Sequence, residues 1–323
     1  MAVLVTGGAG YIGAHVVRLL ADEGVRTGVI DDLSTGDPSR IPGVPLYQLD
    51  LADPANKGEI ARILLDGEFD AVMHFAAKKS VPESVERPAH YYQQNLGSLS
   101  VLLEAMAEAR ATRLVFSSSA AVYGDVAMSP VSEDAPTRPV NPYGETKLAG
   151  EWLVAAAAAA SGIRVASLRY FNVAGAGWPD LGDPTIANLV TLVLDKIERD
   201  EAPVVFGADY PTADGSCVRD FVHVLDLAEA HVAAIGYLEQ EERPFSTFNV
   251  GTGSGTSVLE MVDRLLEATG SGLRPVLRGR RAGDPAEVVA STARIERVLG
   301  WRARFGLDDI AGSAVAAWRR QHD

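Results

Sequence analysis

Three glycines follow the first apolar segment of the chain and constrain its fold more than any other feature. Residues 2–5 predict a buried strand. Gly7, Gly10 and Gly13 come next and lead into the helical pattern at 12–20. Glycines at this spacing let the backbone turn tightly and approach a pyrophosphate, whose charge is stabilised by the amino end of the helix. The pattern therefore predicts a strand–turn–helix unit that binds a dinucleotide.

Short apolar runs alternate with helical patterns through the first half of the chain. Strands are predicted at 2–5, 28–30, 71–75, 114–116 and 165–168. Helical periodicity lies between them at 12–20, 99–109 and 147–159. Such alternation, with continuously apolar strands and right-handed connections, is typical of a parallel sheet covered by helices on both faces. We expect an α/β protein with a Rossmann-type doubly wound sheet.

The pattern changes after about Asn172, where Gly, Pro and Asp cluster at 175–184 and 207–215. We expect residues 1–172 to form the dinucleotide-binding domain, with 216–242 returning to it. Residues 173–215 and 243–323 are expected to form a smaller mixed α/β domain at the C-terminal side. Ser257, followed three residues later by Glu260, predicts the start of a helix in that domain.

Composition excludes several classes of protein. The chain has 29 Lys and Arg against 43 Asp and Glu, a net charge of −14, which disfavours general binding to nucleic acid or anionic membranes. Its single cysteine, Cys217, excludes an intrachain disulfide and disfavours a cysteine-built metal site. No secretion signal or membrane-spanning run is seen. We expect a cytoplasmic globular protein with no metal, nucleic-acid or membrane partner.

Acidic residues follow the predicted second strand. Asp31 comes 18 positions after Gly13, where an acid can bind the adenosine ribose hydroxyls. Asp32 adds a second negative charge, and the next cation along the chain is Arg40. A 2′-phosphate would be repelled, so we expect NAD rather than its phosphorylated form. Asp50 is a weaker candidate for the adenine edge, with a simple loop acid as the alternative.

Tyr143 and Lys147 are four residues apart and share one face of a predicted helix. Converting a tyrosine of pKa about 10 into a base near pH 7 requires roughly 4 kcal/mol. One cation about 4 Å away supplies about 4 kcal/mol at an effective dielectric constant of about 20. Lys147, together with an oxidised nicotinamide, would therefore suffice. Chance alone often produces this spacing, but the glycine motif and the serines 117–119 make a proton-transfer site the favoured interpretation.

Over essentially its whole length, the chain resembles the UDP-glucose 4-epimerases of the extended short-chain dehydrogenase/reductase family. The segments that carry the resemblance are 5–13, 74–79, 116–124, 141–144, 169–172, 206–212 and 218–223. The stretch 206–223 is the most specific, whereas the glycine motif is shared by the superfamily. The resemblance implies an NAD-dependent isomerase that interconverts UDP-glucose and UDP-galactose through a 4-keto sugar. It also implies a homodimer, for which the helices at 99–109 and 147–159 are the apolar candidates.

By this resemblance, Ser119, Tyr143 and Lys147 match a catalytic trio. Tyr143 is expected to take the proton of the sugar 4-hydroxyl while C4 passes a hydride to NAD. The implied cofactor-binding residues are Gly7, Gly10, Tyr11, Ile12, Gly13, Asp31, Asp32, Asp50, Leu51, Phe75, Ala76, Ala77, Lys79, Asn95, Tyr143, Lys147 and Tyr170. Asp32 and Ala77 depart from the common family pattern, which often has Asn and Gly there; neither change removes a needed group.

The nucleotide-sugar side rests on charge and on the resemblance. Arg278, Arg280 and Arg281 crowd together and Arg219 lies in the most specific stretch, so a diphosphate could be bound by guanidinium groups. The alternatives are a solvated arginine loop and an ion pair between Arg219 and Asp220. The implied substrate-binding residues are Ser119, Tyr143, Asn172, Asn188, Leu189, Phe206, Arg219, Arg281, Asp284 and Val288.

Val288 corresponds to the gate of the family's sugar pocket, where a large aromatic residue excludes a 2-acetamido group. Valine is smaller, so we expect some activity on UDP-N-acetylhexosamines. A UDP-glucuronate 4-epimerase or another nucleotide-sugar 4-epimerase remains an alternative. Ala120 and Ala121 stand where dehydratases and decarboxylases need an acid, which disfavours both. A non-catalytic NAD-binding scaffold is least favoured, because Tyr143 and Lys147 are both present.

Overall fold

The computed structural model describes residues 1–126, 128–241, 243–281 and 283–322, and the chain forms two compact units. The first comprises Met1–Gly124, Pro136–Tyr170 and Ala228–Phe248. The second comprises Asp125–Ala135, Phe171–Leu227 and Asn249–Asp323. These bounds differ from the predicted domains at 125–135, 171–172, 216–227 and 243–248.

Long-range pairing explains the difference at 125–135. Val131 forms a parallel bridge with Ala290, and its carbonyl also accepts a hydrogen bond from the Asn249 side chain (2.8 Å). The Glu133 carboxylate accepts a bond from the Asn249 backbone N–H (2.9 Å). Segment 125–135 therefore belongs with the second unit although it lies inside the first in sequence.

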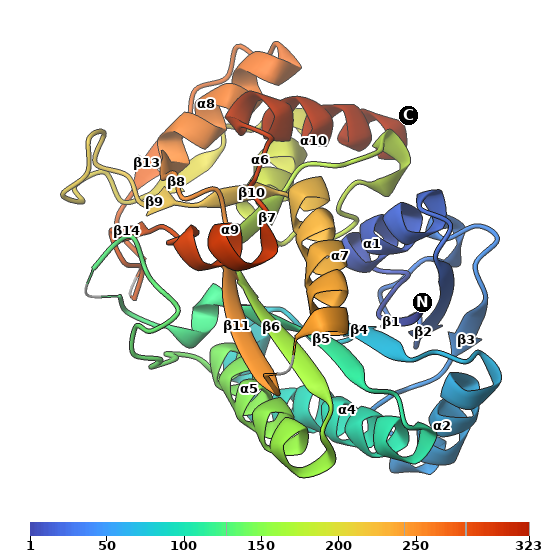
Figure 1. Cartoon of the computed structure of the whole chain (residues 1–323). Coiled ribbons are helices and arrows are strands. Elements are labelled where there is room, and N and C mark those ends of the chain that lie inside the picture. The colour runs from blue at the N-terminus through green and yellow to red at the C-terminus, as the bar shows by residue number, and fades with distance from the viewer. Residues whose placement is uncertain (127, 242, 282, 323) are drawn as a thin grey trace. The chain divides into compact units, whose positions relative to one another are not determined.

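The first unit is built on a seven-stranded sheet with the order β11-β6-β5-β4-β1-β2-β3 (Figure 1). The pairs among β1 to β6 are parallel, which confirms the predicted Rossmann-type sheet. β1 lies between β4 and β2, at the point where the strand order reverses and such sheets bind ligands. The strands are β1 (Ala2–Thr6), β2 (Arg26–Asp31), β3 (Leu46–Gln48), β4 (Ala71–His74), β5 (Arg113–Ser119), β6 (Arg164–Tyr170) and β11 (Phe245–Val250).

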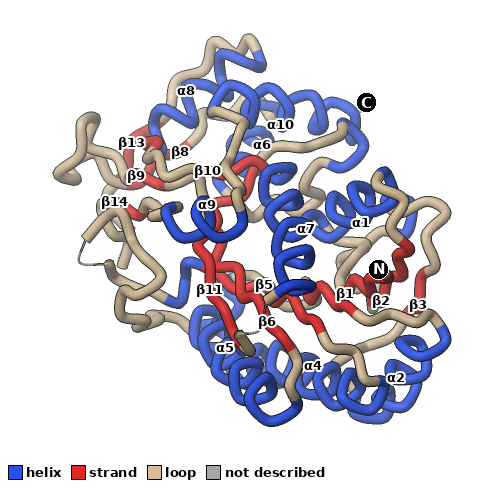
Figure 2. Tube along the Cα trace, viewed as in Figure 1, coloured by secondary structure: helices blue, strands red, loops and turns tan. Residues whose placement is uncertain are grey.

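Helices cover both faces of this sheet. Figure 2 shows α2, α4 and α5 along one side of the strands, and α1 and α7 along the other. Leu4 and Leu114 of the strands are fully buried in one cluster with Leu99 and Leu102 of α4. The helices are α1 (Tyr11–Asp22), α2 (Lys57–Asp66), α3 (Val81–Glu86), α4 (Pro88–Ala109), α5 (Pro142–Ser161) and α7 (Val224–Gln240), with 3-10 turns at Pro38–Arg40, Pro54–Asn56 and Ala120–Val122.

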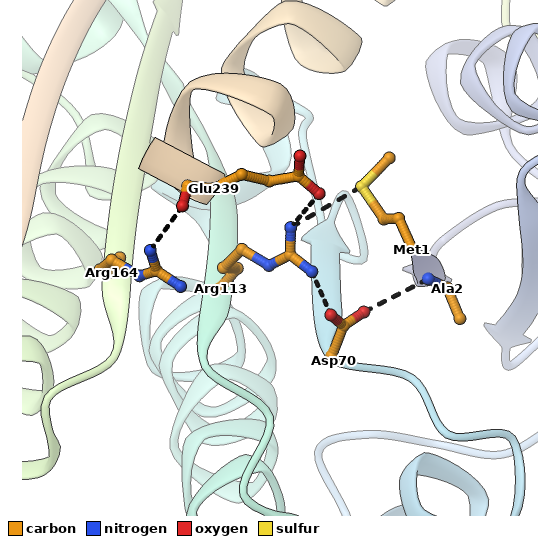
Figure 3. A network of polar contacts seen from close by, with 6 residues as sticks. All are labelled: Met1, Ala2, Asp70, Arg113, Arg164 and Glu239. Carbon is orange, nitrogen blue, oxygen red and sulfur yellow. Dashed lines mark hydrogen bonds and ion pairs between the residues drawn. The ribbon is translucent and has the colours of Figure 1, made fainter. Parts of the chain in front are cut away.

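A polar network joins the amino ends of several strands (Figure 3). The Arg113 side chain, at the start of β5, is 6% exposed and pairs with Asp70 and with Glu239 (2.7 Å), which are about half exposed. Asp70 also accepts a hydrogen bond from the Ala2 N–H (3.3 Å), and the Glu239 carbonyl accepts one from Arg164 (3.2 Å). The network therefore links the starts of β1, β4, β5 and β6 to the end of α7.

The second unit combines small sheets with a helical core. β7 (Asn172–Ala174) pairs with β10 (Phe221–His223), β8 (Val204–Phe206) with β13 (Val276–Arg278), and β9 (Val218–Arg219) with both β12 (Thr256–Ser257) and β14 (Glu287–Val288). The helices are α6 (Leu189–Glu198), α8 (Val258–Thr269), α9 (Ala293–Leu299) and α10 (Leu307–His322), with a 3-10 turn at Pro179–Leu181. Val193, Leu265 and Ile310 join α6, α8 and α10 in one apolar core.

Ser257 caps α8 as predicted, since its hydroxyl accepts a bond from the Glu260 N–H (2.9 Å).

Within the part of the chain that the structure describes, no helix combines the length and apolar character needed to span a bilayer.

Candidate active site

The turn between β1 and α1 requires glycine for steric reasons. Gly7 has φ +71°, and a Cβ there would lie 2.7 Å from the Ala76 backbone nitrogen. A Cβ on Gly13 would lie 2.2 Å from the Gly7 carbonyl oxygen. The backbone thus folds closely against the start of α1 and the loop after β4. This geometry fits the predicted dinucleotide pyrophosphate, which needs a bare backbone and a helix amino end.

Asp31 lies beside this turn at the end of β2. Its carboxylate is buried and accepts hydrogen bonds from the N–H groups of Ala9 (3.0 Å) and Leu33 (2.9 Å). Burial, opposed by these bonds, raises the Asp31 pKa. Asp32 is exposed and accepts bonds from both the N–H (2.9 Å) and the hydroxyl (2.7 Å) of Ser34. Asp31 therefore lies at the end of β2 beside the glycine turn, the position expected for a ribose-binding acid.

The predicted catalytic trio comes together at the carboxyl end of β5 and the amino end of α5. Ser119 is the last residue of β5, and its hydroxyl is hydrogen-bonded to the Tyr143 side chain. The Lys147 ammonium donates to the Ser117 carbonyl (2.8 Å) and lies 5.9 Å from the centre of the Tyr143 ring. Asn141 caps α5 through the Gly144 N–H (2.9 Å), which fixes the first turn that carries Tyr143.

Burial shifts the pKa values of Tyr143 and Lys147 in opposite directions. Burial raises the Tyr143 pKa, and the hydrogen bond from Ser119 opposes this only in part. Burial also lowers the Lys147 pKa to about 8. Lys147 alone therefore does not offset desolvation of the phenol, and the prediction assigned the required shift to Lys147 together with an oxidised nicotinamide. A further positive charge is needed before Tyr143 can act as a base near neutral pH.

A buried ion pair, which the sequence analysis missed, supports the trio. Glu151 lies one helical turn beyond Lys147 and pairs with Arg169 of β6 (2.6 Å); the two side chains are 4% and 8% exposed. Glu151 also accepts bonds from the hydroxyls of Ser118 (2.6 Å) and Ser167 (3.2 Å). The pair thereby ties α5 to β5 and β6. A lone acid four residues after Lys147, in an alanine-rich helix, was the available signal.

Asn95, Phe75 and Tyr170, which were also predicted to bind the cofactor, each contact a buried side chain. Asn95 is buried and bonds to both backbone groups of Lys78 (2.8 and 3.1 Å) and to the Thr146 hydroxyl (3.0 Å). Phe75 and Tyr170 both lie against the buried His231 ring, at 4.6 and 6.1 Å between ring centres. Asn95 therefore connects the loop after β4 to the helix that carries Tyr143 and Lys147.

Three other predicted cofactor residues, Lys79, Asp50 and Leu51, have contacts of other kinds. Lys79 is exposed, with its ammonium 6.0 Å from the Tyr11 ring. Asp50 is exposed and accepts a bond from the Ala52 N–H (2.8 Å), as the loop-acid alternative expected. Leu51 is buried in the apolar core. The structure thus gives these three side chains less support as cofactor ligands than it gives Asp31 or Asn95.

In the second unit, Arg219 does not pair with Asp220, which was the structural alternative. Its guanidinium donates to the carbonyls of Val218 (2.8 Å) and Pro285 (2.9 Å) and lies 3.7 Å from Asp284. The Asp220 carboxylate is fully buried and instead accepts bonds from the backbone N–H groups of Thr252, Gly253 and Ala290.

Two contacts bring predicted substrate residues of this unit together in pairs. Val288 pairs in register with Arg219, and the Arg281 guanidinium lies 3.9 Å from the centre of the Phe206 ring. Arg280 instead bonds to Asp209 (2.7 Å).

Asn188 and Leu189 occupy the start of α6, whereas Asn172 begins β7. The Asn188 side chain accepts a bond from the Thr191 N–H (3.0 Å) and donates one to Asp183 (2.8 Å). Its amide is therefore already used in capping α6.

Comparisons with known proteins bear on this site. Residues 3–251 match the model of the NAD dependent epimerase/dehydratase family. A "UDP-glucose 4-epimerase" from Azospirillum brasilense is 44% identical, over 98% of this chain and 92% of the relative, and one from Lactobacillus helveticus is 42% identical, over 100% and 98%.

Solved structures of UDP-glucose 4-epimerases are also similar to this chain. A UDP-glucose-4-epimerase from Stenotrophomonas maltophila, with bound NAD and formylated UDP-arabinopyranose, superimposes with a TM-score of 0.94 at 40% identity, covering 100% of this chain and 99% of that one. The UDP-Glc/GlcNAc 4-epimerase from Campylobacter jejuni gives a TM-score of 0.87 at 34% identity, with 99% of each chain covered.

Proposed function

Because this chain belongs to the NAD dependent epimerase/dehydratase family, and within it to the UDP-glucose 4-epimerases, we propose that it reversibly interconverts UDP-glucose and UDP-galactose. The observation that carries the proposal is the grouping of Ser119, Tyr143 and Lys147 at the end of β5 and the start of α5, at the same edge of the sheet as the glycine turn after β1 and Asp31 at the end of β2. Proton transfer and dinucleotide binding are thus combined in one unit.

The cofactor is NAD; the glycine turn at Gly7, Gly10 and Gly13 would hold its pyrophosphate and the Asp31 carboxylate its adenosine ribose. Bound NAD would supply a reversible hydride acceptor for C4 of the hexose, so that none is consumed. Direct deprotonation of C4 is chemically poor, because no carbonyl group acidifies that carbon. A transient 4-keto sugar avoids this difficulty.

The side chains of the trio handle the proton. Tyr143, as a phenolate, takes the proton of the sugar 4-hydroxyl and later gives it back. Ser119, which already bonds to Tyr143, binds the same sugar oxygen and relays the proton. Lys147 stabilises the phenolate through its positive charge, and its bond to the Ser117 carbonyl holds the ammonium at this position. The buried pair of Glu151 and Arg169 ties α5 to β5 and β6.

We assign the UDP group to the second unit. Arg219 and Arg281 supply guanidinium groups for the diphosphate, and Asp284 an acceptor for the uridine ribose. Phe206, Asn172, Asn188 and Leu189 complete the candidate pocket, the last two contributing the backbone at the start of α6. Binding through UDP leaves the sugar free to turn and present its other face. The loss of the Arg219–Asp284 contact on UDP binding is an expected consequence.

Incubation of the purified protein with UDP-galactose, without added NAD, tests the proposal. We expect proton NMR to show a mixture of UDP-glucose and UDP-galactose, formed by NAD that copurifies with the protein. Conversion of UDP-glucuronate to UDP-galacturonate in place of this reaction would favour the alternative substrate. Inactivity on both sugars, with NAD supplied, would contradict the proposal.

A second substrate class is supported by Val288 and by the dual specificity named for the Campylobacter jejuni relative. A valine leaves more room for a 2-acetamido group than a tyrosine does. We therefore propose slower epimerisation of UDP-GlcNAc. Failure to convert UDP-GlcNAc at high enzyme concentration, while UDP-galactose is converted, would remove this activity.

We further propose a cytoplasmic homodimer formed through α4 and α5. The two helices pack together, and they expose Tyr92 (40%) and Trp152 (66%). A second copy of the chain would cover these aromatic side chains. Sedimentation equilibrium tests this: we expect a dimer for the wild type and a shift towards monomer for Trp152→Glu. A monomeric wild type would contradict it.

A further inference from the structure

Lys78 links the two loops that flank the glycine turn. It lies in the loop after β4, and its ammonium donates to the hydroxyl of Ser34, in the turn after β2 (3.0 Å). The two residues are 44 positions apart in sequence. Because β1 lies between β4 and β2, the glycine turn lies between these two loops at the same edge of the sheet. The lysine side chain therefore bridges the place where the proposed cofactor binds.

Two hydrogen bonds hold the backbone of Lys78 in place. The Lys78 N–H donates to the Asn95 side chain (2.8 Å), and the Asn95 amide donates to the Lys78 carbonyl (3.1 Å). Asn95 is buried and also bonds to Thr146, whose hydroxyl donates to the Tyr143 carbonyl (2.8 Å). The backbone of Lys78 is thus fixed to α5, whereas its side chain is only half-buried. Such a side chain can change partner at little cost when a ligand arrives.

The ammonium group of Lys78 lies near negatively charged side chains. Ser34, which accepts the bond from Lys78, donates its own hydroxyl to Asp32 (2.7 Å). The nearby Asp32 charge raises the Asp31 pKa, and the Lys78 charge lowers it. Lys78 therefore offsets the repulsion between the two carboxylates at the adenosine-ribose position. The next cation along the chain from Asp32 is Arg40, so only the fold brings a lysine here.

We propose that Lys78 is a cofactor-binding residue that closes over the adenosine half of NAD and slows its release. The inference rests on the proposed function, since it requires NAD at the glycine turn. The ammonium would exchange or share its bond to Ser34 with oxygens of the adenosine diphosphate portion. A charge-assisted bond of this kind corresponds to about a tenfold change in dissociation rate.

The experiment measures release of NAD from the purified holoenzyme, independently of turnover. Wild type, Lys78→Met, Lys78→Arg and Lys57→Met are freed of unbound nucleotide, and NAD appearing in the ultrafiltrate is followed over time at low and high salt. Lys57 is the matched control: it removes the same charge from the same unit, but its ammonium faces Glu104 (4.0 Å) and Glu108 (3.6 Å). Thermal unfolding confirms that each variant is folded.

We expect Lys78→Met to release NAD about tenfold faster at low salt, with a smaller ratio at high salt. Lys78→Arg and Lys57→Met should stay close to the wild type. In equilibrium titrations of protein stripped of NAD, Lys78→Met should weaken binding of ADP-ribose and leave binding of nicotinamide mononucleotide unchanged. This pair of probes assigns the effect to the adenosine half.

Three results would overturn the inference. One is unchanged NAD release in Lys78→Met, and another is an equal acceleration in Lys57→Met. The third is a loss of nicotinamide mononucleotide binding equal to the loss of ADP-ribose binding. If the wild type itself bound no NAD, the cofactor assignment of the proposed function would fail as well. NAD binding by wild type with no difference in Lys78→Met would reject only the role of Lys78.

Discussion

Each end of the central sheet buries a cation, but the two cations have different partners. At the amino ends, Arg113 is paired with the carboxylates of Asp70 and Glu239, which water also reaches. At the carboxyl ends, the buried Lys147 bonds to a neutral carbonyl, and burial lowers its pKa to about 8. The amino-end network stabilises the fold, whereas the carboxyl end keeps a charge available for chemistry. Perturbed pKa values of this kind are typical of functional sites.

The largest effect is expected at the carboxyl end, on turnover alone. Tyr143→Phe removes the proton acceptor but keeps the ring, so kcat for UDP-galactose should fall about a thousandfold. The melting temperature should stay close to that of the wild type, because the substitution keeps the buried ring and removes a hydroxyl that is hydrogen-bonded to Ser119. Steady-state kinetics and a thermal melt on the same preparation check both. Near wild-type turnover would show that the proton acceptor lies elsewhere.

The buried pair next to the site should carry the largest stability effect. Glu151→Gln leaves Arg169, 8% exposed, without its counter-charge, so we expect the free energy of unfolding to fall by about 3 kcal/mol. Urea denaturation measures this difference. A loss below about 1 kcal/mol would mean that the buried pair is no more important than an exposed one.

Breaking the amino-end network should cost less, and it should leave the chemistry intact. Arg113→Met leaves two carboxylates that are about half exposed and can be solvated, so we expect a loss of about 2 kcal/mol with unchanged kcat. Arg26→Met, which breaks an exposed pair with Glu68, is the control and should cost about 0–1 kcal/mol. A large fall in kcat for the folded Arg113 variant would contradict the division between the two ends.

Another effect is expected on the pH dependence of stability, where the change over a single pH unit is small. His74, at the carboxyl end of β4, is fully desolvated, and burial lowers its pKa from the ordinary 6.5 to about 3. Below about pH 6.5 the unfolded chain takes up this proton and the folded chain does not, so stability falls with falling pH towards pH 3. His74→Phe should reduce the slope by about 1.4 kcal/mol per pH unit near pH 5. Equal slopes in both proteins would show that His74 is protonated when folded.

Local patterns in the sequence were enough to predict the glycine turn, the parallel strands and the shared helix face of Tyr143 and Lys147, whereas the resemblance to the family singled out Ser119. Each depends on residues close in sequence or on strand ends that share one edge of the sheet. Glycine spacing, helical periodicity and strand order therefore determine them together.

Such local patterns could not predict contacts between residues that are distant in sequence. The bridge from Val131 to Ala290, which assigns segment 125–135 to the second unit, has no local signal. The same holds for Lys78 reaching Ser34, and for Asp220 turning to Thr252 rather than Arg219. The raised Tyr143 pKa depends on how completely the fold excludes water, which the spacing to Lys147 does not reveal.

The central claim is that C4 of the sugar is inverted by transient oxidation and not by deprotonation. It is tested most directly by converting UDP-galactose in deuterated water and recording the proton NMR spectrum of the product at equilibrium. The account predicts UDP-glucose that retains protium at C4, because the hydride returns to the carbon it left. Deuterium from the solvent at C4 would contradict it.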